Sequence, residues 1–204
     1  MQLQQALGLI QEFWQEPVWP FQPAPTAEAE LDRLRQEFPS PLPPALVEYL
    51  TRAAPMTWAS FAAVGNPIDV YGFAQLGLRQ DGYNFNSVTQ QPLTDWPDHW
   101  FMIANEGGDP IIVDLQAADG AVIRFEHGAG SWEDGAVLAD SIGQFLLCAA
   151  AVQHALRHLG GDDPITDDEN GFQLVPSAAA WLFPHMREWA GPYYNEWCAP
   201  FDNA

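Results

Sequence analysis

The connections between the β-rich segments of this chain are short, and their length constrains the fold more than any other feature. From about residue 58 onward, β-branched and aromatic runs are separated by Gly, Asn, Asp and Pro. These runs are Ile68–Phe73, Trp100–Ala104, Pro110–Leu115 and Ala121–Glu126. Parallel neighbours need a crossover of about a dozen residues or more, whereas antiparallel neighbours need only a hairpin. The pattern therefore predicts an antiparallel sheet, with a mixed sheet as the alternative.

The polar segment Asn105–Pro110 raises the main question about function, because two apolar runs flank it. Its carboxylates, Glu106 and Asp109, could bind or cleave a ligand. Alternatively, the two glycines between them could form a turn between two strands, since glycine adopts φ > 0 readily. A second turn, Ala118–Ala121, predicts an antiparallel hairpin between the two runs that flank it. In its second strand polar and apolar residues alternate, so we expect Arg124 on a solvent-facing side.

Helical periodicity precedes and follows these strands. Apolar residues at helical spacing predict amphipathic helices over residues 3–14, 26–38 and 42–53. Ser141 and Gln144 have the spacing of a capping box, and the helix that they open extends to Gly160. Helices, an antiparallel sheet and a closing helix packed on it define an α+β fold, with a Trp-rich C-terminal extension. We divide the chain into residues 1–27, a helix and Pro-rich connector; 28–159, the α+β domain; and 160–204, an acidic loop and the extension.

Length and cysteine content are those of a globular chain that needs no covalent support. A chain of 204 residues fits one large domain, or one domain with an appendage. Cys148 and Cys198 have no CxxC spacing, and we expect buried free thiols in a reducing compartment. The N-terminus lacks the basic region of a signal peptide, and no apolar run reaches the ~18 residues of a membrane span. We therefore expect a cytoplasmic protein.

The charge balance excludes several classes of chemistry. The chain has 27 acidic and seven basic residues, a formal charge of −20 and no lysine. P-loop nucleotide binding, pyridoxal-phosphate chemistry and kinase-like phosphoryl transfer each need a lysine. Direct nucleic-acid binding is disfavoured because the chain would repel phosphates. An acidic surface instead attracts basic partners, although the charge could also serve solubility alone.

Three segments carry a resemblance to a known family. They are the Leu42-Pro43 helix start with Leu46, Tyr49 and Leu50; residues 96–115, which contain WPDHWFMIA, EGGDP and VDL; and residues 139–146, ADSIGQFL. In this order, from about residue 28 to 158, they resemble the SUKH superfamily of Smi/Knr-like domains. The Asn-Gly pair that commonly follows the first helix is replaced here by Ala53-Ala54-Pro55.

The resemblance implies a protein-binding domain without catalysis. Bacterial members of the superfamily are thought to be immunity proteins that neutralise polymorphic toxins, often nucleases, and fungal members resemble regulatory scaffolds of cell-wall synthesis. In this family the segment around Gly107 and Gly108 is a hairpin turn. We therefore expect an immunity protein that binds a basic toxin, with a scaffold as the alternative and a carboxylate-based hydrolase as the third hypothesis; the oligomeric state stays open.

Aromatic and acidic residues are interspersed between residues 81 and 100 and again near residue 132. Interface hot spots favour Trp and Tyr, and an acidic surround suits a basic partner. The alternative is that these aromatics pack against the sheet. The candidate partner-binding residues are Asp81, Tyr83, Asp95, Trp96, Asp98, Glu106, Asp109, Trp132, Glu133 and Asp134.

Two metal-binding patterns are incomplete. For the acidic residues 162–171, an EF-hand alignment with Gly171 at the sixth position fails at its first and twelfth positions, Thr166 and Ser177, and a solvated acidic loop fits better. His154 and His158 have an i,i+4 spacing but lack the Glu of an HExxH motif, and they also suit the C-terminal end of a helix. We expect no metal and no cofactor.

Overall fold

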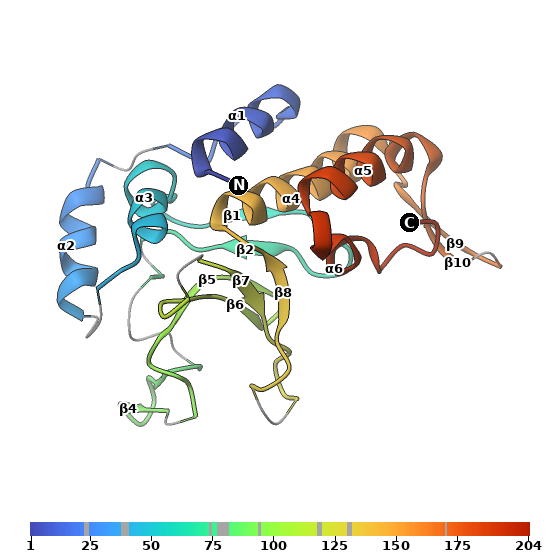
Figure 1. Ribbon diagram of the computed structural model, residues 1–204. Helices are drawn as coiled ribbons and strands as arrows, with labels where there is room; N and C mark the ends of the chain where they lie inside the picture. The colour runs from blue at the N-terminus through green and yellow to red at the C-terminus, as the bar shows by residue number, and fades with distance from the viewer. Residues whose placement is uncertain are drawn as a thin grey trace.

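The computed structural model describes residues 1–22, 25–37, 41–73, 75–76, 82–93, 95–117, 120–129, 132–169 and 171–204. Within these ranges, helices at both ends of the chain flank a central six-stranded sheet (Figure 1). The predicted α+β class is confirmed. None of the described helices is long and apolar enough to cross a membrane.

The central sheet has the strand order β1-β2-β5-β6-β7-β8, and every pair of neighbours is antiparallel. The mixed-sheet alternative is therefore wrong. The strands are β1 Ala59–Phe61, β2 Ile68–Val70, β5 Trp100–Glu106, β6 Asp109–Asp114, β7 Val122–Arg124 and β8 Ala136–Ala139. Between β2 and β5 the chain leaves the sheet and forms a separate ribbon of β3 Phe85–Asn86 and β4 Gln91–Pro92.

The polar segment after β5 is a tight turn, as the resemblance implied. Gly107 and Gly108 lie between the paired residues Glu106 and Asp109, and their φ angles are +61° and +108°. Positive φ at both central residues is the requirement of a two-residue type I′ hairpin, which glycine meets without strain. The predicted hairpin of β6 and β7 is also confirmed, whereas residues 118 and 119 of its turn lie outside the described residues.

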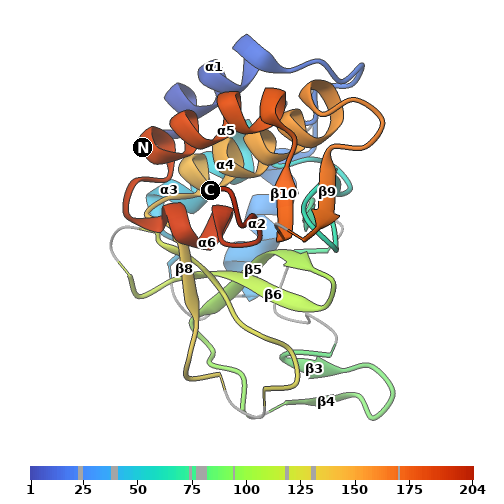
Figure 2. The same ribbon diagram turned by 90° about the vertical axis from the view of Figure 1, so that its right-hand side faces the viewer.

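One face of the sheet is covered by α4, Ile142–His154, which begins at the predicted cap: Ser141 Oγ accepts a hydrogen bond from Gln144 N. All 13 residues of α4 are buried. Besides the sheet, its neighbours are α1, Leu3–Phe13, and α5, Pro176–Trp189 (Figures 1 and 2). A π-helical turn, Ala155–Leu159, continues α4 to the predicted end at Gly160.

The two remaining N-terminal helices, α2 Ala27–Glu37 and α3 Pro44–Arg52, pack on each other beside the sheet (Figure 1). The apolar residues at helical spacing, which predict the amphipathic helix over residues 42–53, are buried: Leu42, Leu46, Tyr49, Leu50 and Ala53. On α2, Arg33 pairs with Glu30 and Glu37 and also donates to Leu76 O at 3.1 Å. Arg33 therefore links α2 to the segment that follows β2.

The C-terminal extension packs into the same core instead of projecting from it. Its last helix, α6 Tyr194–Cys198, follows a 3₁₀ turn, Gly191–Tyr193, and the Trp197 indole donates to Leu138 O of β8 at 2.9 Å. Cys148 and Cys198 are both buried free thiols. The stretch expected to be an acidic loop contains a strand: β9 Ile165–Asp168 pairs with β10 Gly171–Leu174. The backbone and side chain of Asp202 bond in turn to Phe172 of β10, which holds this hairpin.

β2 ends at Val70, three residues earlier than predicted, because the chain turns against the segment after α3. Phe73 N donates to Pro55 O, and Gly72 lies so close that a Cβ built on it would be 1.5 Å from Thr57 O. That contact is with backbone atoms, which cannot move without displacing the segment. Only glycine is therefore compatible with this crossing.

Gly72→Ala should destabilise the protein by at least about 3 kcal/mol, because the added methyl group overlaps two backbone carbonyls. Gly8→Ala is the matched control. Gly8 lies exposed within α1 with open space around its Cα, so the same change should stabilise the protein by about 0.5–1 kcal/mol. Urea denaturation measures both free energies of unfolding, and equal effects of the two substitutions would contradict the prediction.

Candidate functional site

The sheet face opposite α4 carries its own aromatic cluster. In β5 the side chains alternate, so Phe101 and Ile103 belong to the helix-covered core, whereas Met102 and Trp100 belong to the second cluster. The buried members of this cluster are Trp96, Met102, Ile112 and Phe125, and the partly buried members are Tyr71, Tyr83, Trp100, Ile123 and Trp132. The residues between β2 and β5 and those between β7 and β8 thus cover the face that the described helices leave free (Figure 2).

The rings of this cluster pack in a defined order. Trp100 stacks on Phe125 with ring centroids 4.2 Å apart and an interplanar angle of 23°. Trp96 lies beneath, 4% exposed, and is nearly perpendicular to both Trp100 and Trp132 at 5.5 and 5.4 Å. Its indole N–H has no acceptor among the residues that the structure describes. Such mutual packing fixes the orientation of the two outer indoles.

The glycine turn after β5 anchors both covering segments. The Tyr83 hydroxyl donates to Gly108 O at 2.5 Å, and Asp109 Oδ1 accepts a hydrogen bond from His127 N at 2.8 Å. Burial, with smaller contributions from Tyr71 and Asp109, raises the pKa of Tyr83 to about 12. The hydroxyl therefore stays protonated and remains a donor across the physiological pH range.

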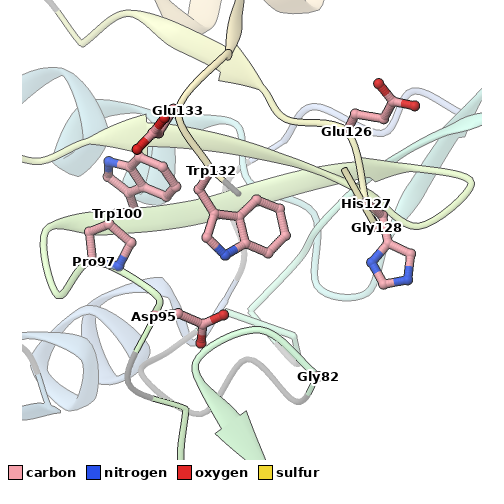
Figure 3. Close-up of a pocket in the computed structure, with 9 residues that line it drawn as sticks. All are labelled: Gly82, Asp95, Pro97, Trp100, Glu126, His127, Gly128, Trp132 and Glu133. Atoms are coloured by element: carbon pink, nitrogen blue, oxygen red, sulfur yellow. The ribbon is translucent and has the colours of Figure 1, made fainter. Parts of the chain in front are cut away.

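Between the covering segments lies an open cleft of about 630 Å³. Its lining residues are Gly82, Asp95, Pro97, Trp100, Glu126, His127, Gly128, Trp132 and Glu133. Figure 3 shows Trp132 near the centre of this group, with Trp100 and Glu133 on one side and Asp95 below it. Two indoles and three carboxylates thus meet around one hollow, and the only basic group among the described lining residues is His127.

The cleft brings together many of the residues predicted for partner binding. Asp95, Trp132 and Glu133 line it, and the rings of Tyr83 and Trp96 contact Trp132. Asp98 and Asp134 are exposed next to the lining residues Pro97 and Glu133. Asp109 does not line the cleft, but it accepts a hydrogen bond from the backbone of the lining residue His127. Asp81 lies outside the described residues.

Glu106 is not part of the cleft. It pairs with Arg124 at 2.5 Å, and Arg124 lies opposite Ile111, a residue of the helix-covered core. The expected solvent-facing side for Arg124 is therefore wrong: this residue is at the rim of the helix-covered face, and Phe125 supports the cleft. Alternation in the sequence identifies two faces but does not say which one the helices cover.

Three lining residues that bear on the chemistry are not among the ten candidates, although the first belongs to the aromatic run between residues 81 and 100: Trp100, Glu126 and His127. Trp100 follows the predicted residue Trp96 at a strand start, so its aromatic character alone could have signalled it. Glu126 and His127 follow β7, and their place at the cleft depends on the bond between His127 N and Asp109. That contact joins residues distant in sequence, which periodicity does not reveal.

The histidine pair lies in a different environment: His154 is the last residue of α4, and His158 is in the π-helical turn that follows it. The His154 ring contacts Phe13 and Trp181 with centroids 5.3 and 4.7 Å away, and its Nδ1 has no partner among the described residues. His158 Nε2 lies 3.1 Å from Glu16 Oε1. In the described part of the chain, no group of three or more His, Cys, Asp or Glu is placed to hold a metal ion. The expectation of no metal stays a prediction.

His154 should make stability depend on pH. Burial, then the proximity of His158 and His185, lowers its pKa from the ordinary value of 6.5, so the folded protein favours the neutral ring. The unfolded chain takes up this proton first, so the free energy of unfolding should fall as the pH drops below about 6.5. Urea denaturation at stepped pH should show a shallower fall for His154→Phe than for the wild type. Exposed His127→Gln is the control, and equal slopes for wild type and His154→Phe would contradict this.

The fold is an α+β domain with an aromatic and acidic cleft on the sheet face opposite α4. The family model described as SMI1 / KNR4 family (SUKH-1) matches residues 25–148. The match covers more than half of the chain, and the chain belongs to this family. No curated protein and no solved structure matches the chain.

The matched residues include the whole cleft but not α1, α5 or α6. Membership in the family supports a protein-binding domain of the immunity or regulatory kind. The aromatic and acidic cleft is thus part of the family domain, and the terminal helices add to its core from outside the match.

Proposed function

We propose that this protein is a non-catalytic immunity protein that binds and neutralises a basic toxin domain of the nuclease type in the cytoplasm of a bacterium. The observation that carries the proposal is the cleft, in which Asp95, Glu126 and Glu133 surround two indoles. A nuclease surface is basic because it binds phosphates. Carboxylates on a rigid aromatic base would occupy the same basic groups.

The mechanism combines attraction at long range with anchoring at short range. The formal charge of −20 speeds the encounter with a basic domain, and complementary charge is known to raise association rates from about 10⁵–10⁶ to as much as 10⁸–10⁹ M⁻¹s⁻¹. Trp100 and Trp132 then supply apolar area at the centre of the contact. No bond is made or broken, so the complex blocks the toxin by occupancy.

The third hypothesis, a carboxylate-based hydrolase, receives less support. Its two candidate carboxylates each have a structural partner: Glu106 binds Arg124, and Asp109 accepts from His127 N. Glu106→Gln and Asp109→Asn should therefore affect stability and not a reaction. The regulatory scaffold differs from the immunity protein in its partner, since a scaffold does not require a basic one.

The test is capture of partners from the native cell lysate at low salt, elution with rising salt and identification by mass spectrometry. A single basic nuclease-like domain should elute only at high salt, because screening weakens attraction between exposed charges. The captured domain should then kill host cells when expressed alone and not when co-expressed with this protein. A neutral partner, or elution independent of salt, would favour the scaffold.

The double variant Asp95→Asn/Glu133→Gln should slow association with the captured toxin about tenfold and flatten the salt dependence, because the exposed rim charges mainly steer the encounter. The matched control, Asp167→Asn/Glu169→Gln, removes the same charge from the exposed β9–β10 hairpin, which Figure 2 shows on the helix side of the central sheet. Surface plasmon resonance measures both rates. An equal effect of the two double variants would show that net charge, not the cleft, steers the partner.

A further inference from the structure

We propose that the cleft is an arginine-binding site, which receives one arginine side chain from the surface of the partner. The identity of that partner rests on the proposed function, whereas the chemistry of the cleft does not. The guanidinium group would lie against the indoles of Trp100 and Trp132 and donate hydrogen bonds to Asp95 and Glu133.

The aromatic base of the cleft is prepared before any ligand arrives. Phe125 stacks on Trp100, and Trp96 contacts both outer indoles nearly at right angles, so neither indole needs to reorganise on binding. Trp132 also meets Phe125 edgewise, at 88°, and both outer indoles line the hollow. A planar cation placed over such a ring is attracted by the negative charge of its face.

The carboxylates around this base have no cation of their own in the described part of the chain. Asp95, Glu126 and Glu133 take part in none of the salt bridges among the described residues. Other carboxylates of the chain are already engaged, such as Glu30 and Glu37 with Arg33. The three at the cleft are exposed, so they retain their capacity to accept hydrogen bonds from an incoming group.

Arginine matches this arrangement better than other side chains. Its guanidinium is planar, weakly hydrated and carries five N–H donors, so it can stack on an indole and bind a carboxylate at its edge simultaneously. A lysine ammonium is strongly hydrated and has no plane to stack. An apolar anchor would cover the carboxylates without pairing them, which is unfavourable. A cation–π contact already exists elsewhere in the protein, where the Arg187 guanidinium carbon lies 4.9 Å from the centre of the Tyr194 ring.

The experiment uses small probes and the full-length protein. N-acetyl-arginine amide is titrated into the ¹⁵N-labelled protein at constant ionic strength, and the indole N–H signals are followed by NMR. N-acetyl-citrulline amide, which has the same shape without the charge, and N-acetyl-lysine amide are the comparison probes. Arginine should shift the Trp100 and Trp132 signals saturably, lysine should bind about 3- to 10-fold more weakly and citrulline should not bind.

Amino-acid substitutions test whether the arginine probe binds at the cleft. Asp95→Asn/Glu133→Gln should weaken arginine binding about tenfold, whereas Asp167→Asn/Glu169→Gln should leave it unchanged. Trp132→Phe should weaken it as well, and Trp58→Phe, at an exposed tryptophan outside the cleft, should not. These exchanges conserve shape or aromaticity, so the folded state is retained, and the unshifted signals of the remaining residues verify that.

Several results would overturn the proposal: no saturable shift, equal binding of citrulline or lysine, or binding unaffected by the cleft variants. These outcomes are separable from failure of the immunity function. If a basic toxin is captured and binds the cleft variants normally, the arginine site is wrong and immunity stands. If the arginine probe binds as expected but no toxin is captured, the site stands and the immunity function fails.

Discussion

The rest of the structure depends on the complete burial of α4. Apart from Gln144, Gln153 and His154 its residues are apolar, and all 13 are buried, so one sheet face is not enough to cover it. α1 and α5 supply the remaining cover from opposite ends of the chain. The segments that lie outside the family match are therefore part of the core of this protein, and Trp197 and Phe201 of the extension are both buried in it.

Placing all these helices on one side of the sheet leaves the other side to the loops. A sheet face rich in Met102, Ile112 and Phe125 cannot remain in contact with water without loss of stability, and aromatic side chains from the covering segments close it. Loops close a surface less completely than a helix does, because they approach from separate directions. The cleft lies where the segment before β5 and the segment after β7 meet but do not join.

The sequence predicted what depends on neighbouring residues and missed what depends on distant ones. Gly107-Gly108 between two apolar runs, and Ser141 three residues before Gln144, specify a turn and a helix start locally, and both are present. The face assignment of Arg124 failed because alternation is symmetric until the position of α4 is known. The strand β9 was missed because Asp167 and Asp168 have low strand propensity, and Asp202, from the far end of the chain, holds its partner strand. The aromatic and acidic residues of the cleft were recognisable by type, but their convergence was not.

The cleft carboxylates are exposed, and an exposed charge attracts a partner only weakly. A binding site of this kind therefore needs several of them. In water, each charge attracts a partner by only about 1 kcal/mol at 4 Å, and salt screens even this. When a partner covers the hollow, water leaves and the same charges act at a much lower effective dielectric constant. The indoles of Trp100 and Trp132 line this hollow, so a partner that covers it would bury their apolar surface together with the charges. In the proposed complex, the acidic rim would serve the approach and the aromatic base the docked state, and neither alone would provide both speed and retention.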